Sequence, residues 1–157
     1  MRLDLHTLAE SASQNWIEAN KGSLESKSES AMGLGGSLGR SLYYQKKYGE
    51  AEAVFREWLE ISKESRGEDN EETIWLGDWL GSSLYKQKNY SEAEAVFSEW
   101  LEISKNALGE DDATTIGLAN WMAHSLYMQK NYVGAEEVYR KWLEISKNAF
   151  GGNNTKT

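Results

Sequence analysis

The stretch EWLEISK at residues 57–63 occurs again as EWLEISK at 99–105 and as KWLEISK at 141–147. The starting residues 57, 99 and 141 are 42 apart. Three copies in one register are hard to obtain by chance, so the chain is a tandem repeat. A period between about 20 and 50 residues is typical of a solenoid, in which each unit buries its apolar face by stacking on its neighbours.

Composition favours a soluble, elongated protein. The chain has 157 residues, 39% of them hydrophobic, with seven Trp, and its mean hydropathy is −0.68. These values predict an ordered core with a large polar surface. No apolar stretch approaches the roughly 20 residues that a membrane helix needs, and the N-terminus lacks the apolar run of a signal peptide. We therefore expect no membrane partner and a cytoplasmic location.

Charge and cysteine content exclude several functions. The net charge of −8 and the pI near 4.9 argue against nucleic acid as the partner. The absence of Cys excludes disulfides, thiol catalysis and zinc ribbons.

Apolar residues recur at spacings of three and four, which predicts two helices in each unit. Lys88 and Asn89 form the predicted turn between the helices of the second unit, and a glycine at 67 or 109 closes a second helix before acidic residues begin the next unit. Strands are excluded by this periodicity, so the fold class is all-α. The predicted helix pairs are 31–46 with 48–65, 73–88 with 90–107, and 115–130 with 132–149. The corresponding repeats are 25–66, 67–108 and 109–150.

The two ends differ from the repeats. Residues 1–24 align with a second helix but have a polar outer side, which predicts an N-terminal capping helix. Residues 151–157 are polar and predict a disordered tail. Without a cap after the third hairpin, we expect partial exposure of Val138, Trp142, Ile145 and Phe150, which makes them candidates for self-association.

Tyr90, Ala93 and Phe97 follow the helix end Leu84-Tyr85-Lys86-Gln87, and their counterparts recur in the other two units. This pattern resembles the tetratricopeptide repeat, and the 42-residue period with Gly-Glu-Asp linkers is similar to its long, kinesin-light-chain-type variant. The resemblance covers residues 25 to 150. It implies a right-handed superhelix whose first helices line a concave groove that binds an extended peptide or a partner helix.

Two departures from the family pattern concern side-chain bulk and proline. Small residues replace a bulky one in each first helix, and Trp replaces Ala in each second helix. We infer that each Trp fills a small-residue stripe on a neighbouring helix, so that truncating a Trp to Ala costs about 3–5 kcal/mol. The positions are Gly35, Gly77 and Ala119, with Gly39, Gly81 and Ala123 one turn on, and Trp58, Trp100 and Trp142. The chain has no Pro, which leaves the superhelical pitch open.

The glycine-rich segment 33–39 has an alternative interpretation as a phosphate-binding loop. No strand precedes it, the Lys and Ser/Thr of a P-loop are missing, and two of its glycines fall on the small-residue positions of the repeat. The structural interpretation is therefore favoured.

The resemblance places the groove on first-helix residues that are not used in stacking. Aromatic side chains dominate this set, and Tyr, Trp and Arg are the residue types that most often anchor interfaces. The candidate groove residues are Arg40, Tyr43, Trp75, Asp78, Trp79, Tyr85, Lys86, Asn120, Trp121, His124 and Tyr127.

Tyr43, Tyr85 and Tyr127 recur at one repeat position. They either form a ladder along the groove or pack between adjacent hairpins. Trp79 and Trp121 stand where the kinesin-light-chain type often has peptide-gripping Asn, which weakens a peptide mode carried over from that type. Mixed charges in the groove favour a protein or peptide with apolar anchors over an acidic tail.

Catalysis finds no support. His6 and His124 have no Ser or carboxylate at a justified spacing, and the acidic runs after Gly67 and Gly109 lack the pattern of a calcium loop. We expect no enzyme activity, no cofactor and no metal.

Two functions remain. One is a protein-interaction scaffold that holds a partner in its groove. The other is a self-assembling structural unit that forms a homodimer through the third hairpin. The near-identity of successive units indicates recent duplication or a consensus-like engineered chain, and the sequence does not separate these origins.

Overall fold

The structure is a computed structural model that describes residues 11, 15, 18, 19 and 29–151. Except for four residues, the predicted capping helix at 1–24 lies outside the described residues, and so does the predicted tail after Gly151.

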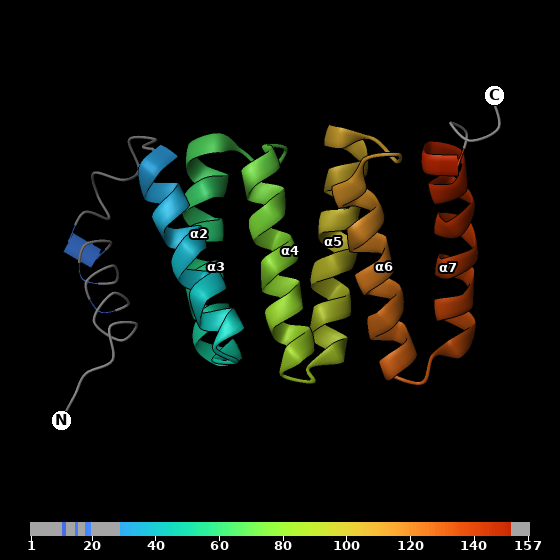
Figure 1. Cartoon of the computed structure of the whole chain (residues 1–157), viewed down its shortest axis with the longest axis horizontal. Coiled ribbons are helices and arrows are strands. Elements are labelled where there is room, and N and C mark those ends of the chain that lie inside the picture. Colours follow the sequence, from blue (N-terminus) through green and yellow to red (C-terminus); the bar gives the residue numbers. More distant parts are fainter. Residues whose placement is uncertain (1–10, 12–14, 16–17, 20–28, 152–157) are drawn as a thin grey trace.

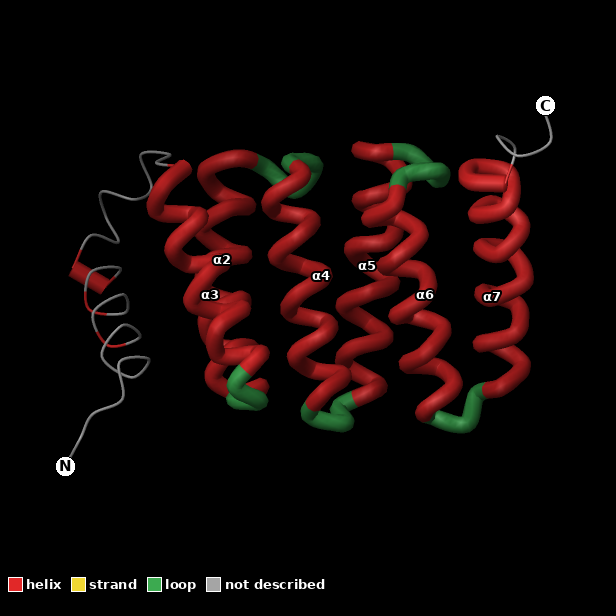
Figure 2. Tube along the Cα trace, viewed as in Figure 1, coloured by secondary structure: helices red, strands yellow, loops and turns green. Residues whose placement is uncertain are grey.

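The described chain forms three helical hairpins in a row (Figure 1). The short turns alternate between the lower and the upper edge of the row of helices (Figure 2). The predicted all-α solenoid is therefore confirmed, and no strand occurs within residues 29–151. The helices are α2 Glu29–Tyr44, α3 Tyr48–Arg66, α4 Glu71–Lys86, α5 Tyr90–Leu108, α6 Ala113–Met128 and α7 Tyr132–Ser146, followed by the π-helical turn η1 Lys147–Gly151. None of the described helices is long and apolar enough to cross a bilayer.

The helices form two layers. Each helix packs on the next one along the chain, and in addition α2 contacts α4, and α4 contacts α6. The backbones of the second helices α3, α5 and α7 do not approach one another in this way, although the Arg56 side chain of α3 reaches Glu92 of α5. The first helices are therefore the closely spaced layer, which is the layer expected on the inside of a curved solenoid.

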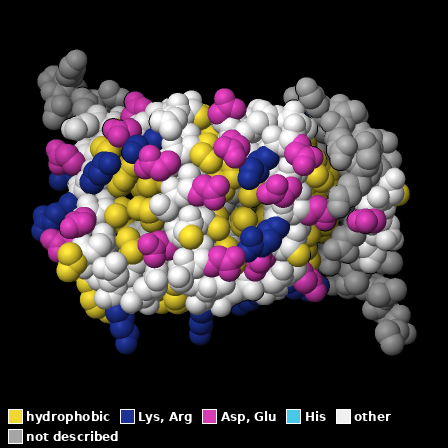
Figure 3. Space-filling view, turned by 180° about the vertical axis from the view of Figure 1, so that it is seen from behind, with side chains coloured by type: hydrophobic (Ala, Val, Ile, Leu, Met, Phe, Trp, Pro, Cys, Tyr) yellow, Lys and Arg dark blue, Asp and Glu magenta, His cyan; other side chains and the backbone are white. Residues whose placement is uncertain are grey.

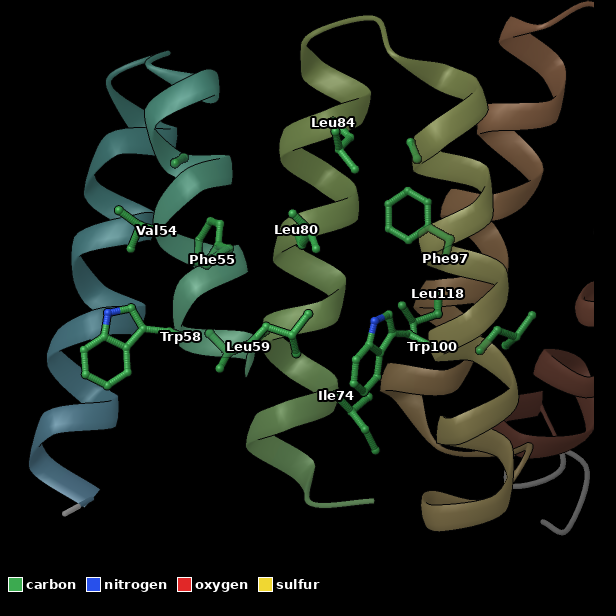
Figure 4. Packing of buried hydrophobic residues seen from close by; sticks show 14 of the residues in the cluster. Val54, Phe55, Trp58, Leu59, Ile74, Leu80, Leu84, Phe97, Trp100 and Leu118 are labelled. Atoms are coloured by element: carbon green, nitrogen blue, oxygen red, sulfur yellow. The ribbon is translucent and has the colours of Figure 1, made fainter. Parts of the chain in front are cut away.

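Each Trp of the repeated motif packs on the first helix of its own hairpin. A Cβ atom added to Gly35 would clash with the Trp58 indole, and one added to Gly77 would clash with Trp100. The inference that Trp fills the small-residue stripe is thus confirmed in these two hairpins. The second small position takes a different ring, because a Cβ at Gly81 would lie 2.5 Å from Cε1 of Phe97. Figure 4 shows Phe97 and Trp100 one turn apart on α5, next to α4.

The first helices begin and end two residues earlier than predicted. The side chains of Asn70 and Asp112 accept the backbone N–H groups of Glu72 and Thr114, and so fix the starts of α4 and α6. At the end of α4, Lys88 adopts a left-handed φ of 65°. Its N–H donates to the Tyr85 carbonyl while Asn89 donates to Leu84, an arrangement that closes the helix at Lys86.

The second helices end as the glycines predicted. Gly67 and Gly109 have φ values of 92° and 97°, which favour glycine over any other residue. The Gly109 N–H donates to the Lys105 carbonyl at 3.1 Å. The third hairpin differs, because α7 ends at Ser146 and the chain continues as the π-helical turn instead of an α-helix to residue 149.

Candidate partner-binding groove

The predicted groove residues all lie on α2, α4 or α6, which form the closely spaced layer. They do not form one uniform surface. Some of them pack into the junctions between hairpins, some line a hollow between α2 and α4, and Lys86, Asn120 and Tyr127 are exposed.

An aromatic cluster recurs at both junctions between hairpins. At the first junction, the ring centroid of Trp79 lies 5.1 Å from Tyr43 and 5.8 Å from Phe55. At the second, Trp121 lies 5.1 Å from Tyr85 and 6.1 Å from Phe97. The alternative in which the repeated Tyr packs between adjacent hairpins therefore describes Tyr43 and Tyr85. Burial raises the pKa of the Tyr43 hydroxyl to about 12, with smaller contributions from its neighbours Tyr48, Tyr44 and Asp78.

A hollow of 280 Å³ lies between α2 and α4. Trp75 forms one wall, and its ring occupies the space beside Gly36, where an added Cβ would lie 2.9 Å from the indole. Arg40 forms another wall, with its guanidinium carbon 5.8 Å from the ring centroid of Trp75 and 5.9 Å from that of Trp79. Both distances lie within the cation–π range. The glycine-rich face of α2 thus makes room for the Trp75 ring and for the hollow beside it.

Asp78 lies on α4 in the same turn of helix as Trp75 and Trp79, whose ring centroids are 5.7 Å apart. Its side chain is mostly buried, and its Oδ1 atom has no hydrogen-bond partner. Burial raises the pKa of this carboxyl group to about 6. Because Oδ1 lacks a donor, the ionised form of this carboxylate costs free energy in the folded protein.

In the third hairpin, His124 and Tyr139 form a pair that the sequence analysis missed. The Tyr139 hydroxyl lies 3.0 Å from Nδ1 of His124, and the Trp121 ring centroid is 5.9 Å from the imidazole. A signal was available, since Tyr139 replaces Phe55 and Phe97 in the same repeat in which His124 replaces Ser82.

The predicted self-association residues behave differently from one another. Trp142 is only 6% exposed, so the expectation of an uncovered indole was wrong. The reason is that each Trp packs within its own hairpin and needs no following unit. Val138 and Ile145 are half-buried, and Phe150 is 58% exposed as expected.

The opposite face of the molecule carries charges of both signs. Figure 3 shows Asp and Glu side chains interspersed with Lys and Arg on the side turned away in Figure 1, with hydrophobic side chains between them. Arg56 of α3, for example, pairs with Glu52 and with Glu92 of α5. This face does not form the basic stripe that nucleic acid requires. Among the described residues, no group of three or more His, Asp or Glu side chains is placed to hold a metal ion.

Comparison with known proteins agrees with this architecture. The family model described as tetratricopeptide repeat matches residues 36–72 and 80–113. A sequence search finds no match among curated proteins.

Solved structures show the same fold at low sequence identity. BtubC (BKLC) from P. vanneervenii superimposes with a TM-score of 0.70 at 19% identity, over 75% of this chain and 46% of that one. A putative kinesin light chain from Podosopora anserina, with nearly identical TPR-like repeats, gives a TM-score of 0.75 at 12% identity, over 92% of this chain and 69% of that one. A point-substituted form of that protein gives the same TM-score and identity, over 91% and 68%. This chain thus spans less than half the length of BtubC.

Proposed function

Because the chain belongs to the tetratricopeptide repeat family, whose fold is a protein-interaction scaffold, we propose that it binds an extended peptide or a partner helix along α2, α4 and α6. The binding site is centred on the hollow between α2 and α4 and extends along α4 to Asp78.

The observation on which this proposal rests is the Asp78 carboxylate. One of its oxygens is buried and has no partner among the side chains around it. A native protein rarely leaves such a group unsatisfied, because the desolvation cost is about 1–3 kcal/mol or more for a charged group. A ligand that draws the Asp78 carboxylate outward and donates an N–H group to it would recover this cost and so gain affinity.

The aromatic wall defines the remainder of the ligand. Trp75 and Trp79 offer indole surface, and Arg40 lies over both rings. Aromatic and Arg side chains are the most frequent binding hot spots. The expected ligand therefore has an apolar side chain for the hollow, and a Lys, an Arg or a free backbone N–H for Asp78. Its N–H donor and apolar anchor fit a peptide better than a nucleic acid or a membrane.

The homodimer through Val138, Trp142, Ile145 and Phe150 is the weaker candidate. Its main premise was an uncovered Trp142, which is instead buried in its own hairpin. We retain a cytoplasmic setting and a non-catalytic role as parts of the proposal.

The test is a displayed library of peptides from disordered protein regions, screened against the wild type and two variants. Asp78→Asn removes the unpaired charge at nearly constant volume. Glu99→Gln makes the same chemical change on an exposed part of α5 and serves as the matched control. We expect peptides enriched by the wild type to bind Asp78→Asn at least about tenfold more weakly, which corresponds to 1.4 kcal/mol, and to bind Glu99→Gln unchanged. If the enriched peptides bind both variants as tightly as the wild type, the proposed binding site at Asp78 is contradicted.

A further inference from the structure

The outer side of the third hairpin is an exposed surface whose counterpart is covered in both earlier hairpins. We call this surface the α7 face and define it by Tyr127, Tyr132, Glu136, Tyr139 and Leu143. Its counterpart on the first hairpin is packed against α4, and its counterpart on the second is packed against α6. In both cases the covering element is the first helix of the next hairpin, so the molecule contains two examples of how such a surface is covered.

The covering helix presents the same three side chains in both cases. The first is the tryptophan, which lies between the repeated Tyr and Phe as described above. Eight residues later, Gln87 donates from Nε2 to Glu52 at 2.8 Å, and Gln129 donates to Glu94 at 2.6 Å. The same amide nitrogens lie 3.5 Å from the carbonyl oxygens of residues 48 and 90.

The third shared contact is a buried pair of hydroxyl groups. Thr73 shares a hydrogen bond of 2.6 Å with Ser62, and Thr115 shares one of 2.6 Å with Ser104. Both threonines lie six residues before the tryptophan. The covering helix thus carries the pattern Thr-x5-Trp-x7-Gln on one side.

On the α7 face these partners are present and uncovered. Leu143 is 56% exposed, whereas its counterparts Leu59 and Leu101 are 5% and 4% exposed. Tyr127 is 53% exposed, although Tyr43 and Tyr85 are half-buried. The face contains a hollow of 350 Å³.

The polar groups of the α7 face also retain the arrangement of the covered ones. Glu52 holds Arg56 with Oε2 and Gln87 with Oε1. Glu136 accepts from Arg140 through Oε1. Its second oxygen, Oε2, therefore corresponds to the Glu52 oxygen that accepts the side-chain N–H of Gln87. Ser146 stands in register with Ser62 and Ser104.

From this continuity we propose that the α7 face docks an amphipathic helix of a partner protein that presents Thr-x5-Trp-x7-Gln. The tryptophan seats between Tyr127 and Tyr139, the glutamine donates to Glu136, and the threonine pairs with Ser146. A second copy of this chain does not fit, because its α2 has Ser37 in place of the tryptophan and Ala31 in place of the threonine, with only Gln45 in register. The α7 face shares Tyr127 with the predicted groove residues, but it includes neither Asp78 nor any residue that lines the hollow between α2 and α4.

The experiment uses the full chain and a synthetic peptide of residues 112–130, stapled into a helix on the side opposite Trp121 and labelled with a fluorophore. This peptide contains the full pattern. Binding is followed by fluorescence anisotropy at micromolar protein. The control peptide carries Trp121→Ala and Gln129→Ala. Three forms of the protein are compared: the wild type, Leu143→Glu on the α7 face, and Asp78→Asn in the groove.

We expect the wild type and Asp78→Asn to bind the peptide equally, and Leu143→Glu and the control peptide each to weaken binding at least tenfold. No binding up to about 100 μM, an affinity of about 5.5 kcal/mol, would overturn the proposal. Equal binding of the two peptides, or indifference to Leu143→Glu, would also overturn it. If light scattering shows that the wild type is a dimer and Leu143→Glu is a monomer, the occupant of the α7 face is a second copy of the chain, and the partner-helix proposal is overturned. Failure of the groove would instead appear as Asp78→Asn having no effect on library peptides.

Discussion

The second and third hairpins have nearly the same sequence in their second helices and different surfaces. Trp100-Leu101 and Trp142-Leu143 occupy the same repeat positions. Both tryptophans are buried, because each packs on its own first helix, but only Leu101 is covered by a following helix. A residue that packs on the first helix of its own hairpin is therefore buried in every repeat, whereas a residue that packs on the following hairpin is exposed in the last one.

The first helices of the two hairpins also differ in their small residues. Gly77 and Gly81 of α4 give way to Ala119 and Ala123 in α6. In the second hairpin, Phe97 occupies the space beside Gly81, whereas in the third hairpin Tyr139 takes the phenylalanine position and bonds to His124. The same repeat position thus permits closer packing in one hairpin and a polar pair in the other.

The largest expected difference concerns the two leucines. Leu101→Ala should lower the free energy of unfolding by about 3 kcal/mol, because it opens a cavity at the junction of α5 and α6. Leu143→Ala should change it by less than about 0.5 kcal/mol, because the side chain is already exposed. Chemical denaturation of both variants measures the two values, and similar losses would break the comparison.

A second difference concerns glycines on the first helices. Gly77→Ala should destabilise the protein by about 2 kcal/mol, since the clash with Trp100 outweighs the better helix propensity of alanine. Gly117→Ala adds a methyl group with no atom within 4 Å and should stabilise by about 0.5–1 kcal/mol. Thermal unfolding of the two variants distinguishes them by the sign of the change in Tm, and a shared sign would contradict the packing described for α4 and α5.

The pH dependence of stability separates Asp78 from Asn120, its counterpart in α6. Because burial raises the Asp78 pKa from 3.8 to about 6, the folded state binds a proton more tightly than the unfolded state. The stabilisation is therefore full below pH 4 and is lost as the pH rises through 6. Relative to Asp78→Asn, the wild type should lose about 1–2 kcal/mol between pH 4 and pH 7, after allowance for partial exposure.

Urea denaturation of the wild type and Asp78→Asn at each pH gives this difference directly, because the other carboxylates are common to both proteins. Parallel stability curves would show that Asp78 titrates normally in the folded state, and the unpaired carboxylate would then lose its role in the groove.

The smallest expected effect concerns the serines in register. Ser104→Ala leaves the Thr115 hydroxyl buried without its partner and should cost about 1 kcal/mol. Ser146→Ala removes a group for which the structure shows no such buried threonine partner, and it should cost less than about 0.3 kcal/mol. A measured cost for Ser146→Ala as large as that for Ser104→Ala would show that the α7 face is already covered.

The sequence was sufficient for features that depend on spacing within one hairpin. The 42-residue period predicted the helix pairs, and the exchange of bulk predicted that each Trp fills a small-residue stripe on a neighbouring helix. The starts of α4 and α6 were displaced by two residues, because the caps at Asn70 and Asp112 look like any other polar residue in an acidic linker. Spacing alone cannot distinguish an exposed carboxylate from a buried one, so the sequence did not reveal the burial of Asp78.

Features that depend on contacts between hairpins were harder to predict. Tyr43 and Tyr85 could equally have lined the groove or filled a junction between hairpins, because the sequence pattern of a first helix does not distinguish these two surroundings. The burial of Trp142 did not follow from the sequence, because spacing does not tell whether a Trp packs on the first helix of its own hairpin or on that of the next. The choice of Leu143 as the exposed residue requires knowing which side of α7 faces outward.

The most direct test of the account is the solvent accessibility of Leu59, Leu101 and Leu143 in solution. Methyl groups of these leucines can be labelled with ¹³C and their NMR relaxation followed as a soluble paramagnetic agent is added. The account predicts strong relaxation of Leu143 and protection of the other two, with Leu143 becoming protected when the stapled 112–130 peptide is added. Protection of Leu143 equal to that of Leu101 without peptide would contradict the claim that the same surface is covered in the first two hairpins and open in the third.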